Sequence, residues 1–432
     1  MKKSILLTLG LCVATSLAIS QPCSAAFVVG GENGWQLSTD GIVDVFATYH
    51  STSPHPGGTH DLSLLDNFDP KDYNQRFGIG VGLLPSVIAL NVKAPTTNGV
   101  DSSVRIGIYP SIGNTGNGSL AGPSGLSASD RFSVGPNIDF REMFYTAKGA
   151  YGELLAGRAL NLYQGKNILT DMTLLTAGTV GLRAHTVTLG HIGYGYLYTG
   201  FGPQIRYTTP DLAGVKLAIA VGEPYDISGG DKTNTPRVEA EFSYAKVFGS
   251  ASVQTWLSGL YQNATRSKTA AVRPGGSEDS IGGAYGLSVG IAGLNLLGSG
   301  YGGRGLGTTS VQDGGALQGL FGGSTDAAGK GRLDWGFLLQ ATYQIIPSVK
   351  IGANYGQTRQ EETDLDTTTR KGTGEGAGRI LVKKQESATA NVVYNLNKFT
   401  QFIAEYTYAQ NTWHDGASQH SNQFALGTMF YW

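Results

Sequence analysis

The sequence predicts an all-β protein, a transmembrane antiparallel β-barrel of about 16 strands. Three observations predict it. Side chains alternate between apolar and polar with a period of two, the alternating segments are as long as a membrane-crossing strand, and short and long connections alternate. The composition agrees, because 64 of the 432 residues are glycine and only 15% are charged. Such a mixture favours strands joined by tight turns.

The N-terminal segment has the pattern of a secretory signal peptide. Lys2 and Lys3 precede an apolar run over residues 5–19, and small residues follow. We expect residues 1–25 to be removed, which leaves 26–432 as one β-barrel domain. A signal anchor is the alternative, although the apolar run is short for a membrane span. Both cysteines lie within the signal, so the mature chain would form no disulfide.

The period of two is clearest between residues 333 and 345, which read LDWGFLLQATYQI. Apolar residues occupy every second position there, and only Leu338 interrupts the polar set. The same alternation recurs over 238–244 and 349–355. Successive side chains of a strand point to opposite faces, so each segment has one apolar and one polar face.

The polar face is predicted to point inward and the apolar face toward lipid. The runs of about 9–13 residues fit a tilted strand that crosses a bilayer. The polar positions include charges in mid-strand: Arg76, Arg105, Arg141, Arg206, Lys216, Glu239, Glu241, Asp334 and Glu405. Such charges cannot form a packed core without partners. A closed barrel with a polar lumen satisfies both observations.

The connections alternate in length. We expect short turns at 94–101, 148–151, 210–214, 248–250, 290–293, 346–348 and 397–400. We expect long loops at 51–72, 111–137, 159–203, 223–235, 263–280, 303–332, 360–384 and 414–420. Short periplasmic turns and long external loops are typical of outer-membrane barrels.

Two places depart from simple alternation. Phe77, Ile79, Val81 and Leu83 share one parity and the following Ile88, Leu90 and Val92 the other, so we expect a bulge near Leu84–Pro85. Glu142 shares the predicted outward parity of Phe140 and Phe144. A charge there is costly against lipid, which favours a wall that packs on another subunit.

Three segments resemble the general diffusion porins of Gram-negative outer membranes. REMFYTAKGAYGELLAGR (141–158) resembles their fourth and fifth strands, PQIRYTTPDLAGVKLAIAVG (203–222) their sixth and seventh, and GIVDVFATY (41–49) their first. The resemblance covers essentially the whole mature chain. It implies a homotrimer in the outer membrane, whose third loop folds into the lumen as an eyelet, and passive diffusion of small hydrophilic solutes.

The resemblance also assigns residues to the eyelet wall. Arg76, Arg141 and Arg206 match family positions where arginines line the eyelet, and Arg158 fits the arginine at the entry to the folded loop. The alternation of the strands also predicts that these four arginines, and Arg105 with them, face the lumen. The lumenal carboxylates of Glu239, Glu241, Asp334 and Glu405 could offset the charge of these arginines. In that case the pore would be nearly unselective between anions and cations.

The folded loop is expected to span 159 to about 203. In the family this loop usually carries several carboxylates, whereas here Asp171 is its only acidic residue, beside Lys166 and Arg183. We therefore predict a more positive eyelet and a modest anion preference.

Other constellations are assigned to structure. The loop histidines His50, His55, His60, His414 and His420 fit no compact metal motif, so we expect solvated side chains, no metal and no cofactor. The tyrosine-rich GYGYLYTGFG (193–202) could grip a sugar ring, but a structural role is favoured.

Other function classes are less favoured. An enzyme would need a Ser–His pair, which the local sequence around His185 and His191 does not supply. A scaffold around a multihaem partner would be blocked by the folded loop. A substrate-specific porin for a sugar or an organic anion is the nearest alternative. Without Lys2 and Lys3 the chain has 29 basic and 32 acidic residues, so no nucleic-acid partner is expected.

The segment FALGTMFYW (424–432) is predicted to be the closing strand. Phe424, Leu426, Phe430 and Trp432 share the outward parity, and the strand should pair with 41–49. Phe430 and Trp432 also resemble the C-terminal signal read by the barrel assembly machinery. Besides that machinery, the expected surroundings are outer-membrane lipid and lipopolysaccharide.

Overall fold

The computed structural model describes residues 27–65, 74–110, 112, 138–180, 187–225, 227, 233–269, 273–312, 323–372 and 378–432. The predicted signal peptide lies outside the described residues. Within these ranges, no helix is both long enough and apolar enough to cross a membrane.

Strands dominate the structure. They are β1 (Phe27–Gly30), β2 (Gln36–Thr52), β3 (Gln75–Gly80), β4 (Val87–Lys93), β5 (Asp101–Pro110), β6 (Ile138–Gly149), β7 (Gly152–Leu160), β8 (Phe201–Thr208), β9 (Val215–Gly222), β10 (Arg237–Phe248), β11 (Ala251–Thr265), β12 (Ser277–Ile291), β13 (Leu294–Arg304), β14 (Leu333–Ile346), β15 (Val349–Glu361), β16 (Val382–Asn395), β17 (Thr400–Trp413) and β18 (Ser418–Tyr431). The short helices are α1 (Gly165–Thr170), the 3-10 helix η2 (Met172–Leu175) and α2 (Asp364–Arg370).

The strands form one closed antiparallel barrel. β18 pairs with β2, with Phe424 opposite Tyr49 and Tyr431 opposite Ile42, as the sequence predicts. β3 and β4 both pair with β2 and are two parts of one wall strand. β1 pairs with the start of β2, which extends beyond the end of β18. The 18 strands of the sheet therefore make a 16-stranded wall, which confirms the predicted fold class.

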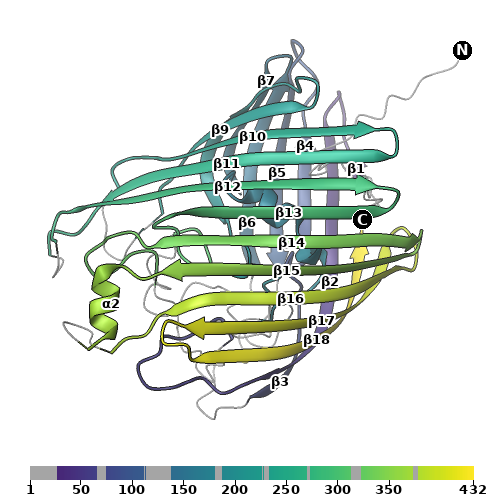
Figure 1. Cartoon of the computed structure of the whole chain (residues 1–432). Helices are drawn as coiled ribbons and strands as arrows, with labels where there is room; N and C mark the ends of the chain where they lie inside the picture. Colours follow the sequence, from purple (N-terminus) through teal and green to yellow (C-terminus); the bar gives the residue numbers. More distant parts are fainter. Residues whose placement is uncertain are drawn as a thin grey trace, which may run out of the picture.

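Short turns and long loops lie at opposite ends of the barrel (Figure 1). The turns between β10 and β11 and between β12 and β13 are at one end, and α2 with its neighbouring loops is at the other. Apolar side chains are exposed on the outer face, for example Leu339 at 55% and Leu426 at 66%. An exposed apolar belt of this kind fits lipid, as predicted.

The wall strand formed by β3 and β4 is broken at residues 81–86, which confirms the predicted change of parity. Val81 and Leu83 were expected to face outward, but they turn inward and are buried. Asp44 on β2 holds the break, because its Oδ2 accepts a hydrogen bond from the Gly82 N–H at 2.5 Å and its Oδ1 accepts one from Ser86 Oγ at 2.8 Å.

The prediction that Glu142 and Phe144 face outward is wrong. The register of β5 and β6 shifts so that Gly107 opposes Glu142 and Ile108 opposes Phe140, which leaves Arg141 as the extra residue of a bulge. A bulge reverses the alternation that follows it. Glu142 therefore points inward, and it gives no support for a subunit contact.

Candidate functional site

An inner segment between β7 and β8, described over residues 161–180 and 187–200, lies along inward-facing side chains of the wall. Trp256 Nε1 on β11 donates to Asn167 Oδ1 at 2.9 Å, and Gln340 Oε1 on β14 accepts from the Met172 N–H at 2.6 Å. Gln423 Oε1 on β18 accepts from the Val180 N–H at 2.6 Å. The inner segment is thus held by strands from β11 to β18.

Three wall carboxylates serve as anchors for internal backbone. Glu239, Asp334 and Glu405 are 3%, 0% and 6% exposed. Their donors are the N–H groups of Leu162 (2.7 Å) and Tyr163 (3.1 Å) for Glu239, of Leu306 and Gly307 (3.1 Å each) for Asp334, and of Gly178 (2.5 Å) with Thr176 Oγ1 (2.6 Å) for Glu405. Buried carboxylates bound in this way are shielded from the water of the lumen.

A second stretch, residues 305–312, also packs inside the barrel, although the sequence predicts only an external loop there. The Tyr198 N–H donates to the Thr309 carbonyl at 2.8 Å, and the Val311 N–H donates to the Tyr198 carbonyl at 3.0 Å. Gln385 Nε2 on β16 donates to the Thr308 carbonyl at 3.2 Å. The apolar Leu306 and Val311, in a stretch otherwise made of small and polar residues, are the sequence signals for this burial.

The inner segment also bonds to the break in the wall. The N–H groups of Leu83 and Leu84 donate to the carbonyls of Thr176 (3.1 Å) and Leu174 (3.0 Å). Residues 81–86 can make these bonds because they are released from the wall ladder. The groups that bind the inner segment therefore lie on β10 to β18 and at the break in the wall. The predicted arginines lie on the other part of the wall, from β3 to β8.

Three predicted arginines face inward on this arc. Arg76 lies opposite the inward-facing His50. Arg141, in the bulge, has its Cζ 5.3 Å from the centroid of the Tyr109 ring, and its Nε donates to Asp139 Oδ2 at 2.7 Å. Arg206 Nη1 lies 3.4 Å from the Leu160 carbonyl oxygen. All three are only partly buried, so they can act on ions in the lumen, although the Asp139 carboxylate offsets part of the charge of Arg141.

Arg105 faces inward as predicted, but acidic neighbours compensate its charge. Its Nη1 lies 2.9 Å from Asp40 Oδ2, and its Nε lies 2.9 Å from Glu142 Oε2. Asn91 Oδ1 accepts a further bond from Nη1 at 3.1 Å. With two carboxylates around it, Arg105 contributes little net positive charge.

Arg158 does not join this wall. It is exposed, and it pairs with Met143 on β6 and Pro203 on β8, which are exposed as well. This register places Arg158 on the outer face, so the parity assigned to it from the sequence is wrong.

The predicted residues of the folded loop have different surroundings. Lys166 Nζ lies 3.6 Å from Glu241 Oε1 on β10. Asp171 is buried, and it accepts hydrogen bonds from Thr173 Oγ1 (2.5 Å) and Tyr196 Oη (2.7 Å). Asp171 therefore stabilises the inner segment instead of facing a solute. Arg183 lies outside the described residues.

The tyrosines of 193–202 are mostly structural. Tyr194 and Tyr196 are fully buried. Burial, together with the charge and the hydrogen bond of Asp171, raises the pKa of Tyr196 well above its ordinary value. Neither ring is available to stack on a sugar.

The histidines are less solvated than predicted. His50 is buried in β2, and the side chain of His414 is 7% exposed, with its Nδ1 3.8 Å from Glu362 Oε2. His60 Nε2 lies 2.9 Å from Asp415 Oδ2, so the first and last loops are neighbours. The other two, His55 and His420, contact the rings of Trp413 and Tyr408. Among the described residues, no group of three or more potential ligands could hold a metal ion.

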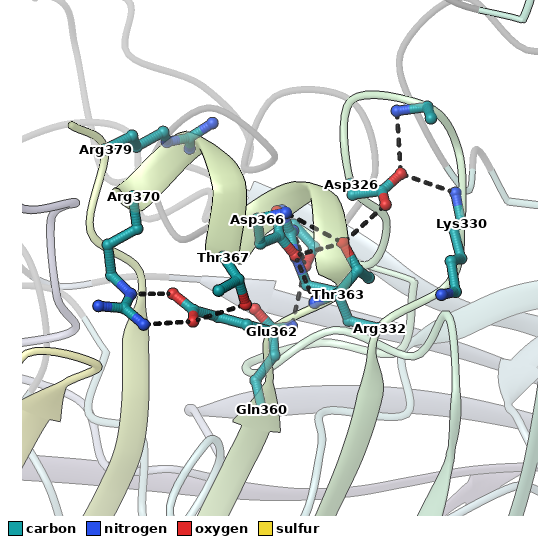
Figure 2. Close-up of polar contacts among 12 residues, drawn as sticks. Asp326, Lys330, Arg332, Gln360, Glu362, Thr363, Asp366, Thr367, Arg370 and Arg379 are labelled. Carbon is teal, nitrogen blue, oxygen red and sulfur yellow. Dashed lines mark hydrogen bonds and ion pairs between the residues drawn. The ribbon is translucent and has the colours of Figure 1, made fainter. Parts of the chain in front are cut away.

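Buried ion pairs join the long loops at the mouth of the barrel (Figure 2). Arg332 donates from Nε and Nη2 to Asp366 of α2, at 2.9 and 2.8 Å, and from Nη1 to the Gly323 carbonyl at 3.1 Å. Burial alone would raise the pKa of Asp366, but the hydrogen bonds and positive charge of Arg332 outweigh it and hold the pKa below its ordinary value. This pair fixes α2 to the loop before β14.

Replacing Arg332 by alanine is expected to release the loop of residues 362–381. Breaking a buried ion pair by removing one partner costs about 3–5 kcal/mol. Faster proteolysis of this loop in the folded barrel would show the loss, whereas Lys371→Ala, at an exposed position beside α2, should cleave like the wild type. Because the pKa of Asp366 is lowered, its contribution is complete above the ordinary carboxyl pKa and is lost as the pH falls through the folded value. Equal cleavage of R332A and wild type would contradict this role.

Comparisons with known proteins agree with the architecture. The family described as Gram-negative porin matches residues 8–414. No curated protein sequence matches the chain. The outer membrane channel DcaP of Acinetobacter baumannii is 14% identical with a TM-score of 0.66, covering 94% of this chain and 100% of that one. The anion-selective porin from Comamonas acidovorans is 14% identical with a TM-score of 0.57, covering 92% and 100%. The trimer form of OmpT of Vibrio cholerae is 12% identical with a TM-score of 0.51, covering 93% and 100%. With its closed 16-stranded wall and a family match over nearly its whole length, the chain belongs to the Gram-negative porins and is an integral protein of the outer membrane.

Proposed function

We propose that this porin is a passive diffusion channel for ions and small hydrophilic solutes, with a modest preference for anions. The preference rests on a difference in exposure between the negative and the positive side chains of the inward face. Carboxylates of the wall bind internal backbone and are buried, while Arg76, Arg141 and Arg206 remain partly exposed on the inward face. Charges that line a narrow aqueous pore determine which ions stay there.

The buried anchors weaken the alternative of an unselective pore. That alternative needs Glu239, Asp334 and Glu405 to act on ions in the lumen, but each is at most 6% exposed and bound to N–H groups. Glu241 has Lys166 beside it. One structural neighbour is described as an anion-selective porin; its likeness to this chain supports the fold, and the preference proposed here rests on the charges.

Reversal potentials in a KCl gradient test the preference. We expect the wild-type potential to have the sign of chloride permeation. Arg206→Gln should lower the permeability ratio of chloride to potassium about two- to threefold. A unit charge about 7 Å from an ion in water contributes about 0.6 kcal/mol, salt at about 0.1 M reduces this by roughly half, and the contribution has opposite signs for chloride and potassium. Arg158→Gln, on the outer face, is the matched control and should change nothing. Clear cation selectivity of the wild type would refute the preference without affecting the channel assignment.

General diffusion is favoured over a sugar-specific pore because Tyr194 and Tyr196 are buried. We also propose a homotrimer, inserted by the barrel assembly machinery and surrounded by lipopolysaccharide. The trimeric neighbour supports the oligomer, and conductance steps in threes would test it. Porin membership favours a channel without enzymatic activity.

A further inference from the structure

An arginine and three aromatic rings lie together at the long-loop end of the lumen. Tyr109, near the end of β5, has its ring centroid 6.2 Å from that of Phe201 at the start of β8. Arg141, in the bulge of β6, has its Cζ 5.3 Å from the centroid of the same Tyr109 ring. Burial raises the pKa of Tyr198, in the last part of the inner segment, and the nearby positive charge of Arg141 acts against this. We call Tyr109, Arg141, Tyr198 and Phe201 the mouth cluster.

The mouth cluster has a buried side and an open side. Tyr109 is only 6% exposed and backs the cluster, whereas Arg141, Tyr198 and Phe201 are each partly exposed. The backbone of Tyr198 is bonded on both sides to residues 305–312, so its ring is held in place while part of it stays open. Aromatic rings fixed beside water favour a solute that has an aromatic face of its own.

Arg141 retains hydrogen-bond donors for such a solute. Its Nε donates to Asp139, but neither Nη1 nor Nη2 forms a hydrogen bond with any residue that the structure describes. The side chain is 20% exposed, so these two groups can be reached from the lumen. A guanidinium binds a carboxylate through two parallel N–H donors, which gives the mouth cluster a place for a carboxylate beside its rings.

The charges around the mouth cluster favour a solute with a single carboxylate. Asp139 and Glu142 already contact its members, Glu142 by accepting from the Tyr109 hydroxyl at 2.9 Å. Arg105, further along β5, is bound by Glu142 and Asp40. A second carboxylate on the solute would therefore be repelled by these acidic groups and would find Arg105 already compensated.

We propose that the mouth cluster binds aromatic monocarboxylates at the entrance of the pore, with the carboxylate at the Nη groups of Arg141 and the ring against Tyr198 and Phe201. Charge-assisted hydrogen bonds hold the carboxylate, and contact between aromatic rings adds to the affinity. The site is weak, because a channel must also release its solute. This inference rests on the proposed function, since it names a class of anion that the channel admits.

Block of the single-channel chloride current by benzoate tests the proposal. Cyclohexanecarboxylate is the matched solute, because it has the same charge and a similar size but no aromatic ring. Added on the long-loop side in planar bilayers, benzoate should half-block the wild type at a concentration about three- to tenfold lower than cyclohexanecarboxylate. Benzene-1,3-dicarboxylate should block less than benzoate.

Two substitutions separate the contributions of charge and ring. Arg141→Gln should raise the half-blocking concentration of benzoate about tenfold, the loss of about one charge-assisted contact. Phe201→Leu keeps an apolar side chain and should remove most of the difference between the two acids. Arg206→Gln is the matched control, because Arg206 lies further along β8 toward the short-turn end; it should affect both acids equally and leave their ratio unchanged.

Three results would overturn the proposal: equal block of the wild type by benzoate and cyclohexanecarboxylate, unchanged block of R141Q by benzoate, or a stronger block by the dicarboxylate. Each of them in a chloride-preferring channel refutes the site alone, whereas clear cation selectivity refutes the proposed preference. Saturation-transfer NMR of benzoate with the purified barrel measures binding without conductance, so the site is tested separately from the channel. Heat-modifiable mobility establishes that each variant is folded, and the two substitutions are independent if one fails to fold.

Discussion

Replacing Glu405 by alanine is expected to broaden the distribution of single-channel conductance and to add frequent transitions between levels. Glu405 on β17 binds the Gly178 N–H and Thr176 Oγ1, and Asn391 Nδ2 donates to it at 3.2 Å. Alanine would leave these donors buried without an acceptor, at a cost of about 1–3 kcal/mol for each. We expect the inner segment to move so that these donors find other acceptors, because the wall strands are held by their backbone hydrogen bonds.

The effect should depend on the acceptor oxygen and not only on the charge. Glu405→Gln keeps one oxygen for Gly178, so we expect a narrower distribution than in E405A. Glu386, outward-facing on β16, supplies the matched control, and Glu386→Ala should behave like the wild type. Recording in planar bilayers at constant voltage gives the measurement. A single sharp conductance level in E405A would show that Glu405 does not hold the inner segment.

Deleting Phe430–Trp432 is expected to abolish the folded barrel in the outer membrane. The deletion removes the pairs of Phe430 with Val43 and of Tyr431 with Ile42, and the reciprocal backbone bonds of Trp432 with Gly41 at 3.2 and 3.1 Å. The freed backbone of β2 would then meet lipid, which cannot form hydrogen bonds with it.

The loss should be visible as the absence of a heat-modifiable band in outer-membrane fractions. Trp432→Phe is the control, since it keeps an aromatic ring and all backbone bonds, and its yield should be close to that of the wild type. Because Phe430 and Trp432 are also predicted to form the assembly signal, Phe430→Ala separates the two roles by leaving the backbone pairing intact. A normal yield of the truncated chain would contradict both roles.

The sequence predicts the wall well because lipid imposes a strict rule on it. Outside the broken strand, nearly every apolar parity in β10 to β18 is confirmed, and so are the closing pair of strands and the order of turns and loops. The failures on β6 and β7 have a local cause. The extra residue at Arg141 reverses the faces of Glu142 and Phe144, and no side chain in the sequence marks a bulge that the backbone ladder alone defines.

The candidate site is predicted less completely because it depends on contacts between distant segments. The inward faces of Glu239, Asp334 and Glu405 follow from parity, but their burial does not. It results from the described residues 161–180, 187–200 and 305–312, which lie far from these carboxylates in the sequence. The burial of Asp171 also depends on distant residues. It accepts five hydrogen bonds, one of them from Asn354 on β15.

The break between β3 and β4 has a consequence for nanopore engineering. Leu83 and Leu84, at the break in the wall, form hydrogen bonds with the inner segment. The width of the pore therefore depends on both the inner segment and the broken strand. Grafting residues 161–200 into another barrel would not reproduce this pore width. In an unbroken recipient strand the backbone N–H groups are already paired with neighbouring strands, so none can bind the grafted segment. A chimera intended to carry this pore size must also carry Asp44 and residues 81–86.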